Sequence, residues 1–228
     1  MADNGAIGKN GRAGFTLLEI LVAIIILSMV LTTVYGAYTG TFHIIEQTKY
    51  SDDVYGMART ALTRMTEDLA SLCPYGGIYS FVAKSAESGK RDFTDLTFLS
   101  SAHLDFKDQR VSGTASISYT VTEGSDNTGA VLTRTDVLYR GDDESDPDAA
   151  GGFILCKYLH SLTYTFYNDM GESFETWDSN SDTHKNRAPA VISISLNFVN
   201  PDDSEDPFAF MTKVYLPMAG ASNAAATE

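Results

Sequence analysis

One carboxylate, that of Glu19, stands inside the longest apolar run of the chain. From Phe15 to Tyr38 it is the only side chain that is charged at neutral pH. A carboxylate in the apolar part of a membrane helix costs about 2.5 to 3.5 kcal/mol and is normally kept with a partner. No Lys, Arg or His on this helix can reach it. A cut between Gly14 and Phe15 would supply a cation, because it frees an α-amino group that can pair with Glu19 of the same or a neighbouring chain.

The apolar run around Glu19 is long enough to cross a bilayer as a helix. Lys9 and Arg12 precede it, with only Asp3 against them. The positive-inside rule therefore leaves the N-terminus in the cytoplasm and sends the rest of the chain across the inner membrane into the periplasm. A cleavable secretory signal fits less well, because no small-x-small site follows a short apolar core.

The segment Gly14-Phe15-Thr16-Leu17-Leu18-Glu19 resembles the class III signal of type IV pilins and type II secretion pseudopilins. The resemblance includes the short basic leader before it and the apolar residues after it. It implies that a prepilin peptidase cuts after Gly14 on the cytoplasmic side and methylates the new N-terminal Phe15. It also implies that Glu19 pairs with a neighbour's N-terminus as subunits enter a filament. The alternative is an ordinary signal anchor with a chance glutamate.

Two further patterns follow the apolar run. Residues 32–41 contain two glycines and four threonines, which weaken a helix and predict a flexible joint. From Val54 onward, apolar residues recur at steps of three and four, which predicts an amphipathic helix that ends at Cys73-Pro74 and packs on the sheet of its own domain. This apolar face comprises Val54, Met57, Ala58, Ala61, Leu62, Met65, Leu69 and Leu72.

Beyond Pro74 the apolar period changes to two, which is typical of half-buried strands. Clear alternation lies within residues 96–98, 117–121, 162–166, 192–198 and 208–216, and weaker strands are expected at 79–82, 130–139 and 153–156. The turn from Asn200 to Pro207 predicts that the last two strands form a hairpin. Three polar inserts, 85–91, 141–152 and 178–186, are expected to be surface loops.

These patterns predict an α+β fold, in which a long N-terminal helix packs on a mainly antiparallel sheet, and the resemblance implies that this fold is pilin-like. The expected parts are a cleaved leader (1–14), a transmembrane and filament-core helix (15–40), an amphipathic helix (41–73), a periplasmic β-rich domain (74–218) and a disordered tail (219–228). About 190 residues remain after the leader and membrane helix, which suits one globular domain.

Charge and cysteines limit the binding functions. The formal charge of −14 repels nucleic acid, so no nucleic-acid partner is expected. Cys73 and Cys156 are a candidate disulfide in an oxidising periplasm, and the alternative is two small buried thiols. No cofactor is expected. Weak candidates for Ca²⁺ ligands, which have an ordinary explanation as solvated acidic loops, are Asp142, Asp143, Asp146, Asp202 and Asp203.

The second half of the chain narrows the resemblance. Residues 162–169, Trp177 and residues 189–196 resemble the J-type minor pseudopilins of type II secretion, and the helix pairs Ala61-Leu62 and Asp68-Leu69 do so too. A second tryptophan often found before Trp177 is missing, with Phe174 nearby instead, and the acidic inserts are long. The resemblance implies a position at the tip of a periplasmic pseudopilus. The implied partners are the I and K types, the major pseudopilin below them, the prepilin peptidase and the inner-membrane platform.

Other functions stay open at this point. A minor type IV pilin or another pseudopilin would share the N-terminal signal. A membrane-anchored periplasmic binding module would suit the aromatic strands and acidic loops. An enzyme is not expected, because the four histidines are scattered and no nucleophile or phosphate-loop motif occurs. Trp177 fits either an interface anchor or the core of the domain, and the core is favoured.

Overall fold

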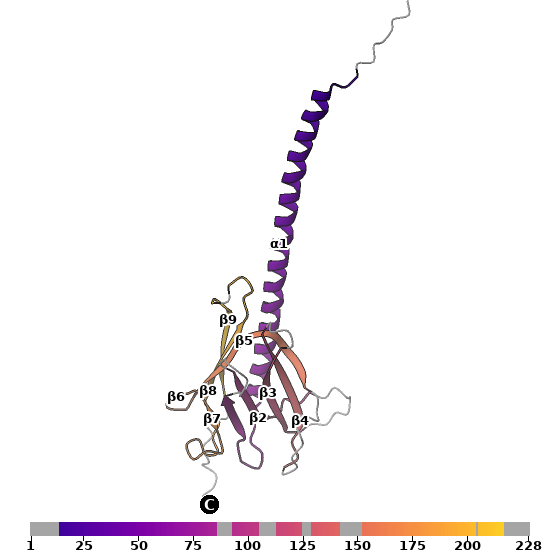
Figure 1. Cartoon of the computed structure of the whole chain (residues 1–228). Helices are drawn as coiled ribbons and strands as arrows, with labels where there is room; N and C mark the ends of the chain where they lie inside the picture. The colour runs from indigo at the N-terminus through magenta and orange to yellow at the C-terminus, as the bar shows by residue number, and fades with distance from the viewer. Residues whose placement is uncertain are drawn as a thin grey trace, which may run out of the picture. The chain divides into compact units, whose positions relative to one another are not determined.

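The computed structural model describes residues 14–85, 93–104, 113–124, 129–141, 152–203 and 205–216. The chain forms two compact units, residues 1–51 and residues 52–228. One helix, α1 (Leu17–Ala70), is followed by strands that form a curled antiparallel sheet (Figure 1). The predicted α+β class is therefore confirmed. The predicted leader before Gly14 and the tail after 218 lie outside the described residues.

Helix α1 runs without a break from Leu17 to Ala70. The joint predicted at 32–41 does not interrupt it, so that prediction is wrong. The threonine hydroxyls donate to carbonyls of the preceding turn, as Thr32 does to Ser28 at 2.8 Å and Thr41 to Ala37 at 2.8 Å. A hydroxyl satisfied in this way by the helix backbone does not compete with the helix. The helix ends three residues before the predicted stop at Cys73.

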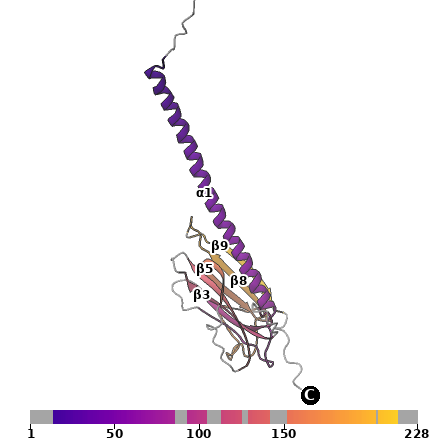
Figure 2. The same ribbon diagram turned by 90° about the vertical axis from the view of Figure 1, so that its right-hand side faces the viewer.

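Within the described residues the strands form one sheet in the order β7-β1-β2-β3-β4-β5-β8-β9, with β6 beside β5, and each pair of neighbouring strands is antiparallel. Figure 1 and, after a turn of 90°, Figure 2 show these strands gathered beside the C-terminal part of α1. Their bounds are β1 Phe81–Ser85, β2 Thr94–Ser100, β3 Ala115–Glu123, β4 Ala130–Leu138, β5 Phe153–Tyr167, β6 Ser173–Phe174, β7 Trp177–Asp178, β8 Val191–Phe198 and β9 Phe208–Tyr215.

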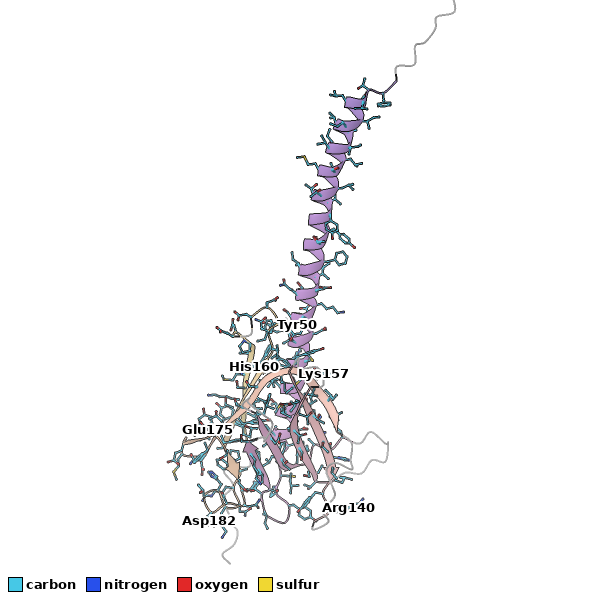
Figure 3. The ribbon with its side chains drawn as sticks, in the orientation of Figure 1. Tyr50, Arg140, Lys157, His160, Glu175 and Asp182 are labelled. Carbon is cyan, nitrogen blue, oxygen red and sulfur yellow. The ribbon has the colours of Figure 1, made fainter. Side chains whose placement is uncertain are left out.

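Most predicted strands match an observed one, and the hairpin between β8 and β9 is confirmed by the pair Phe198↔Phe208. The prediction of separate strands at 153–156 and 162–166 is wrong, because both belong to β5. Tyr158 has a positive φ of 63° inside this strand, and the register with β4 and β8 shifts around it. Such a bulge breaks the alternation that marks a strand in sequence. Figure 3 labels Lys157 and His160, which flank Tyr158 where β5 arches between β4 and β8.

The core lies between the inner face of the sheet and the second half of α1. Four aromatic side chains are fully buried there: Phe81, Phe98, Tyr119 and Phe166. Their rings contact one another across neighbouring strands, with centroids 5.8 to 6.3 Å apart. Trp177 is 2 % exposed, which confirms its predicted place in the core. The buried face of α1 agrees with the predicted stripe and contains Val54, Ala58, Ala61, Met65 and Leu69.

A charged group that the apolar stripe did not predict also lies in this buried face. Asp68 is fully buried, and its carboxylate accepts hydrogen bonds from the hydroxyl of Tyr119 at 2.6 Å and from Nε of Arg134 at 2.6 Å. Arg64, one turn earlier on α1, forms an ion pair with the same carboxylate. A buried carboxylate needs this many donors because its lost hydration is otherwise uncompensated. Asp68 therefore attaches α1 to β3 and β4.

The network continues from Arg134 to a second carboxylate. Asp136 accepts from Nη1 of Arg134 at 2.9 Å and lies 2.7 Å from Nδ1 of His103. Burial alone would raise the pKa of Asp136, but hydrogen bonds from His103, from the Leu104 N–H and from Arg134 outweigh it and lower that pKa. Two arginines thus face two aspartates, and the buried charges balance.

The bulge in β5 depends on a glycine in the neighbouring chain segment. Gly129 has φ +128°, and a Cβ at this position would lie 2.8 Å from the carbonyl carbon of Tyr158. A side chain other than glycine's rarely adopts that backbone conformation, and the close approach leaves no space for one. Gly129 therefore allows β5 to turn from its pairing with β4 to its pairing with β8.

The first prediction concerns the buried carboxylate. Asp68→Asn should lower the free energy of unfolding by about 3 to 5 kcal/mol, because two arginines then share the one buried carboxylate of Asp136 and a buried positive charge is left uncompensated. Urea unfolding of the detergent-solubilised chain, followed by circular dichroism, measures the change. The matched control is Glu67→Gln. Its side chain is 60 % exposed and lies 3.5 Å from Arg64, so it should cost less than about 0.5 kcal/mol. Equal effects of the two variants would contradict a structural role for the network.

The second prediction concerns the bulge. Gly129→Ala should lower the free energy of unfolding by about 1 to 3 kcal/mol, because strain in the backbone and overlap with Tyr158 act together. The control is Gly56→Ala in α1, where a Cβ meets no atom within 4 Å. That change should instead stabilise the helix by about 0.5 to 1 kcal/mol. The same unfolding assay compares them, and an unaffected Gly129→Ala chain would show that the bulge tolerates a side chain.

Candidate functional site

The predicted processing and assembly residues lie at the start of α1. The N–H of Glu19 donates to Oγ1 of Thr16 at 3.3 Å and to the Thr16 carbonyl at 3.1 Å. Since α1 begins at Leu17, Thr16 is the N-cap and Glu19 is the third helical residue, which is the Thr-x-x-Glu spacing of a capping box. This cap was not predicted, although its Thr-x-x-Glu spacing is visible in the sequence.

The bond between Gly14 and Phe15 lies outside the helix. Both residues are exposed, Phe15 by 79 %, and no heavy atom approaches within 4 Å of a Cβ built on Gly14. A peptidase acts on backbone that is accessible and not held in a helix, and this segment meets both conditions. Cleavage between Gly14 and Phe15, and methylation of Phe15, stay predictions.

The position of Glu19 sets its electrostatics. In the first turn its carboxylate is near the unpaired N–H groups of the helix, which stabilise a negative charge by about 0.3 to 1 kcal/mol. This offsets only part of the cost of placing the group in hydrocarbon. The first lysine or arginine after it is Lys49, about 45 Å farther along the helix at 1.5 Å per residue. No lysine or arginine later on α1 is therefore within reach of Glu19.

The first part of α1 exposes an apolar surface on all sides. Every residue from Gly14 to Phe42 is exposed, and Figure 3 shows side chains projecting around the whole ribbon there. Within the described ranges, α1 is the one helix that is long and apolar enough to cross a membrane. Such a surface is stable only in lipid or against other apolar surfaces. The exposed fraction of the large apolar side chains in this part lies between 46 % for Val22 and 84 % for Leu17.

The two cysteines are not joined. Cys73 and Cys156 are both free thiols, so the candidate disulfide is absent from the structure. Sγ of Cys73 lies 3.8 Å from the hydroxyl of Thr114, at the start of β3. Cys156 pairs with Leu132, which pairs with Val121 near the other end of β3. Thr114, beside Cys73, and Val121, on the Cys156 side, are seven residues apart, which corresponds to about 20 Å along a strand. The Cα atoms of two disulfide-bonded cysteines lie only about 4.4 to 6.8 Å apart. Burial raises the pKa of the Cys156 thiol to about 12.

The candidate calcium ligands divide into two groups. Asp142, Asp143 and Asp146 lie outside the described residues. The Asp203 carboxylate accepts from the Glu205 N–H at 3.0 Å, and the Asp202 N–H donates to the Asn200 side chain at 3.1 Å, as is usual in a turn between two strands. Across the part of the chain that the structure describes, no group of three His, Cys, Asp or Glu side chains is arranged to hold a metal ion. Calcium binding stays a hypothesis.

Sequence reasoning missed the role of Asp68, which appeared only as part of a resemblance. Its signal was present: a carboxylate lies within the apolar stripe, between Met65 and Leu69, and four residues after Arg64. A charged residue on the buried face of an amphipathic helix indicates a partner in the domain. The sequence could not name Arg134 as that partner, because the two are 66 residues apart and meet only in the folded sheet.

Aromatic rings surround Trp177 on the short strand β7. The His184 ring stacks on the indole at 3.8 Å between centroids, and Phe174 meets it edge-on at 5.6 Å. The indole N–H donates to the Arg187 carbonyl at 2.9 Å. Burial lowers the pKa of His184. Insert 178–186 is therefore attached to the domain at its first residues, where Ser179 is buried. Phe174 packs against Trp177 in the region where the second tryptophan is missing.

A comparison with family models gives a match at the start of the chain. The family model of the prokaryotic N-terminal methylation motif matches residues 9–35, the segment that contains Gly14, Phe15 and Glu19. No curated protein matches the chain. The motif is typical of pilin-like structural proteins, which are processed by a prepilin peptidase, assemble with other pilins and are held by one membrane helix. Together with the long helix and the antiparallel sheet, it supports placing this chain in the type IV pilin superfamily.

Proposed function

We propose that the chain is a minor pseudopilin of type II secretion, of the J type. The observation that supports a pilin-like function is the match to the methylation motif. In this motif a lone carboxylate, that of Glu19, lies five residues after the proposed cleavage site at Gly14, on an exposed apolar helix. The J type is supported by the resemblance of residues 162–169, Trp177 and residues 189–196. These residues lie in β5 and the turn after it, in β7, and in β8 with the two residues before it, and Trp177 is buried in the domain.

In this function the chain does its work by packing. The leader holds the N-terminus in the cytoplasm while α1 spans the inner membrane, and the peptidase removes residues 1–14 and methylates Phe15. The new amine of one subunit neutralises Glu19 of its neighbour, which favours transfer of the helix from lipid into a bundle of like helices. The exposed apolar side chains of the first part of α1 then contact those helices in the filament.

The periplasmic domain would contact the other tip subunits. In the proposed complex these are the I and K types, with the major pseudopilin below them. The inner-membrane platform and its ATPase drive growth of the filament, which assists export of folded proteins through the outer-membrane secretin. A net charge of −14 keeps such a domain soluble and away from nucleic acid.

A minor type IV pilin is the second candidate, because the methylation motif serves both systems. A membrane-anchored binding module is a third, and it requires no neighbour for Glu19. Co-expression with the I and K types, followed by purification of the full chain, separates the tip function from both of these candidates. A stable complex with both supports the tip function, and recovery of the chain alone supports a pilin of another system or a lone binding module.

The third prediction concerns processing. Mass spectrometry of the chain from its native host should find N-methylated Phe15 at the N-terminus, with residues 1–14 removed. Gly14→Leu should leave the leader attached, because a branched side chain replaces the small residue beside the cut. The matched control is Gly11→Leu, three residues earlier in the leader, which should be processed as usual. A native chain that still carries its leader would contradict the pilin-like function.

The fourth prediction concerns Glu19. Glu19→Gln should be inserted and cleaved normally, but its incorporation into filaments should fall by about tenfold or more. A neutral amide is less costly in lipid, so the gain from pairing with an amine is lost. Quantitative cross-linking between subunits in membranes measures incorporation. The control is Glu46→Gln, an exposed glutamate later on α1, which should assemble normally. Normal assembly of the Glu19→Gln chain would remove pairing as the basis of assembly.

A further inference from the structure

The apolar run of helix α1 is longer than the hydrocarbon core of a bilayer. Between Leu17 and Ile45 the helix is unbroken, and Glu19 is the only Asp, Glu, Lys or Arg. This span is about 42 Å long at 1.5 Å per residue, whereas the hydrocarbon core is about 30 Å thick. Placing all of it in hydrocarbon would need a tilt of about 44°, beyond the range of about 0 to 40° for membrane helices. Part of the run therefore lies outside the hydrocarbon.

The excess length belongs to the end of the run that is farther from the N-terminus. From Leu17 to Leu31, large apolar side chains occur on every side of the helix, so this part needs lipid around its whole circumference. Beyond Leu31 the composition changes, because residues 32–41 contain two glycines and four threonines. The segment from Thr32 to Ile45 needs hydrocarbon less, and it is the part that reaches the headgroup layer.

The helix has two unlike halves between Thr32 and Ile45. Residues three and four apart lie on the same side of a helix, and the rings of Tyr38 and Phe42 are in contact, 4.4 Å apart between centroids. We call this half the aromatic face, and it comprises Val34, Tyr35, Ala37, Tyr38, Phe42, Ile44 and Ile45. Thr41 also falls in it, and its hydroxyl donates to the Ala37 carbonyl at 2.8 Å. The opposite half holds the small residues Thr32, Thr33, Gly36, Thr39 and Gly40.

The aromatic face needs a cover. The exposed fraction of its large side chains lies between 47 % for Phe42 and 70 % for Tyr35, and an exposed apolar face of this kind is unfavourable in water. Lipid is the cover that the helix itself indicates, because this face continues the membrane-spanning part without a break. Tyrosine rings are also typical of the headgroup level. A helix with one apolar half rests in this layer with that half about 5 to 10 Å deep.

We propose that the aromatic face of α1 docks on the lipid headgroup layer at the end of the membrane span that is farther from the N-terminus. The helix then leaves the hydrocarbon inclined, with Tyr38 and Phe42 toward lipid and with Gly36 and Gly40 toward water. The contact sets the direction in which the helix leans. The inference goes beyond the proposed function, because it depends only on the membrane helix and needs neither cleavage after Gly14 nor a filament.

The test uses the full chain, reconstituted at a low ratio of protein to lipid in phosphatidylcholine vesicles with brominated acyl chains, which quench tryptophan fluorescence. Tyr38→Trp and Phe42→Trp place an indole on the aromatic face. Gly40→Trp places one on the opposite half, where a Cβ meets none of the described atoms within 4 Å. The first two should be quenched at least about twofold more strongly than the third, because only the apolar half of an interfacial helix is buried.

The design separates the face of the helix from its depth. Gly40 lies between Tyr38 and Phe42 along the helix, so a gradient of depth alone would give Gly40→Trp an intermediate degree of quenching. Iodide in the water gives the reciprocal measurement and should quench Gly40→Trp the most. Trp177 is the only tryptophan of the unaltered chain and is buried in the domain. Its emission in that chain is the background, and circular dichroism verifies that each variant is helical.

Three outcomes would overturn the proposal. Equal or intermediate lipid quenching of Gly40→Trp would mean that lipid surrounds this part of the helix. Lipid quenching at none of the three positions would place the segment outside the membrane. Shielding of Tyr38→Trp and Phe42→Trp from both lipid and iodide would mean that a protein surface, such as a second copy of the helix, covers the aromatic face. None of these outcomes bears on whether the chain is cleaved after Gly14, so the proposed function is tested separately.

Discussion

The cost of a carboxylate in apolar surroundings is the constraint that governs this molecule, and helix α1 meets it twice. Asp68 lies in the buried face of the helix and receives hydrogen bonds or ion pairs from Tyr119, Arg134 and Arg64. Its charge is fully compensated inside one domain, so it contributes to a fixed contact between helix and sheet. Glu19 lies in the first turn, where the helix terminus supplies only a small part of what an ionised carboxylate needs. No lysine or arginine later on the helix is close enough to supply the rest.

This difference relates directly to what the two units of the chain can do. Residues 52–228 have a closed core of aromatic rings and a balanced internal charge network, so they can fold as a domain around the second half of α1. Residues 14–51 contain no such core, and the apolar side chains of their first part are exposed. One unit stabilises itself, and the other is stabilised by lipid or by other helices. That division suits a subunit that is stored in a membrane and then added to a filament.

The sheet itself is shaped by a single irregular position. Tyr158, in the left-handed region, lies within β5, and Gly129 gives it the space it needs. One strand can therefore pair with β4 over its first half and with β8 over its second. The long strand carries the sheet to β9, whose outer edge stays open in the described ranges. The bulge thus positions β9 beside the flank of α1 that carries Arg59 and Leu62, where Met211 and Thr212 line the same hollow.

Sequence alone determined the features that depend on local pattern. The apolar run, its single carboxylate and the glycine before it predicted the membrane helix and the methylation motif, and the change of period after Pro74 predicted an antiparallel sheet, because helices and strands repeat at different intervals. Only the tertiary structure could show that Asp68 meets Arg134, that Cys73 and Cys156 are far apart, that β5 is one strand and that the edge of β9 is open. Each of these depends on which distant residues become neighbours, and sequence spacing does not record that. The continuity of helix α1 through residues 32–41 belongs neither to the features predicted from local pattern nor to those set by distant contacts. Propensity opposed it, and the helix nevertheless continues there, with threonine hydroxyls bonded to carbonyls of the preceding turn.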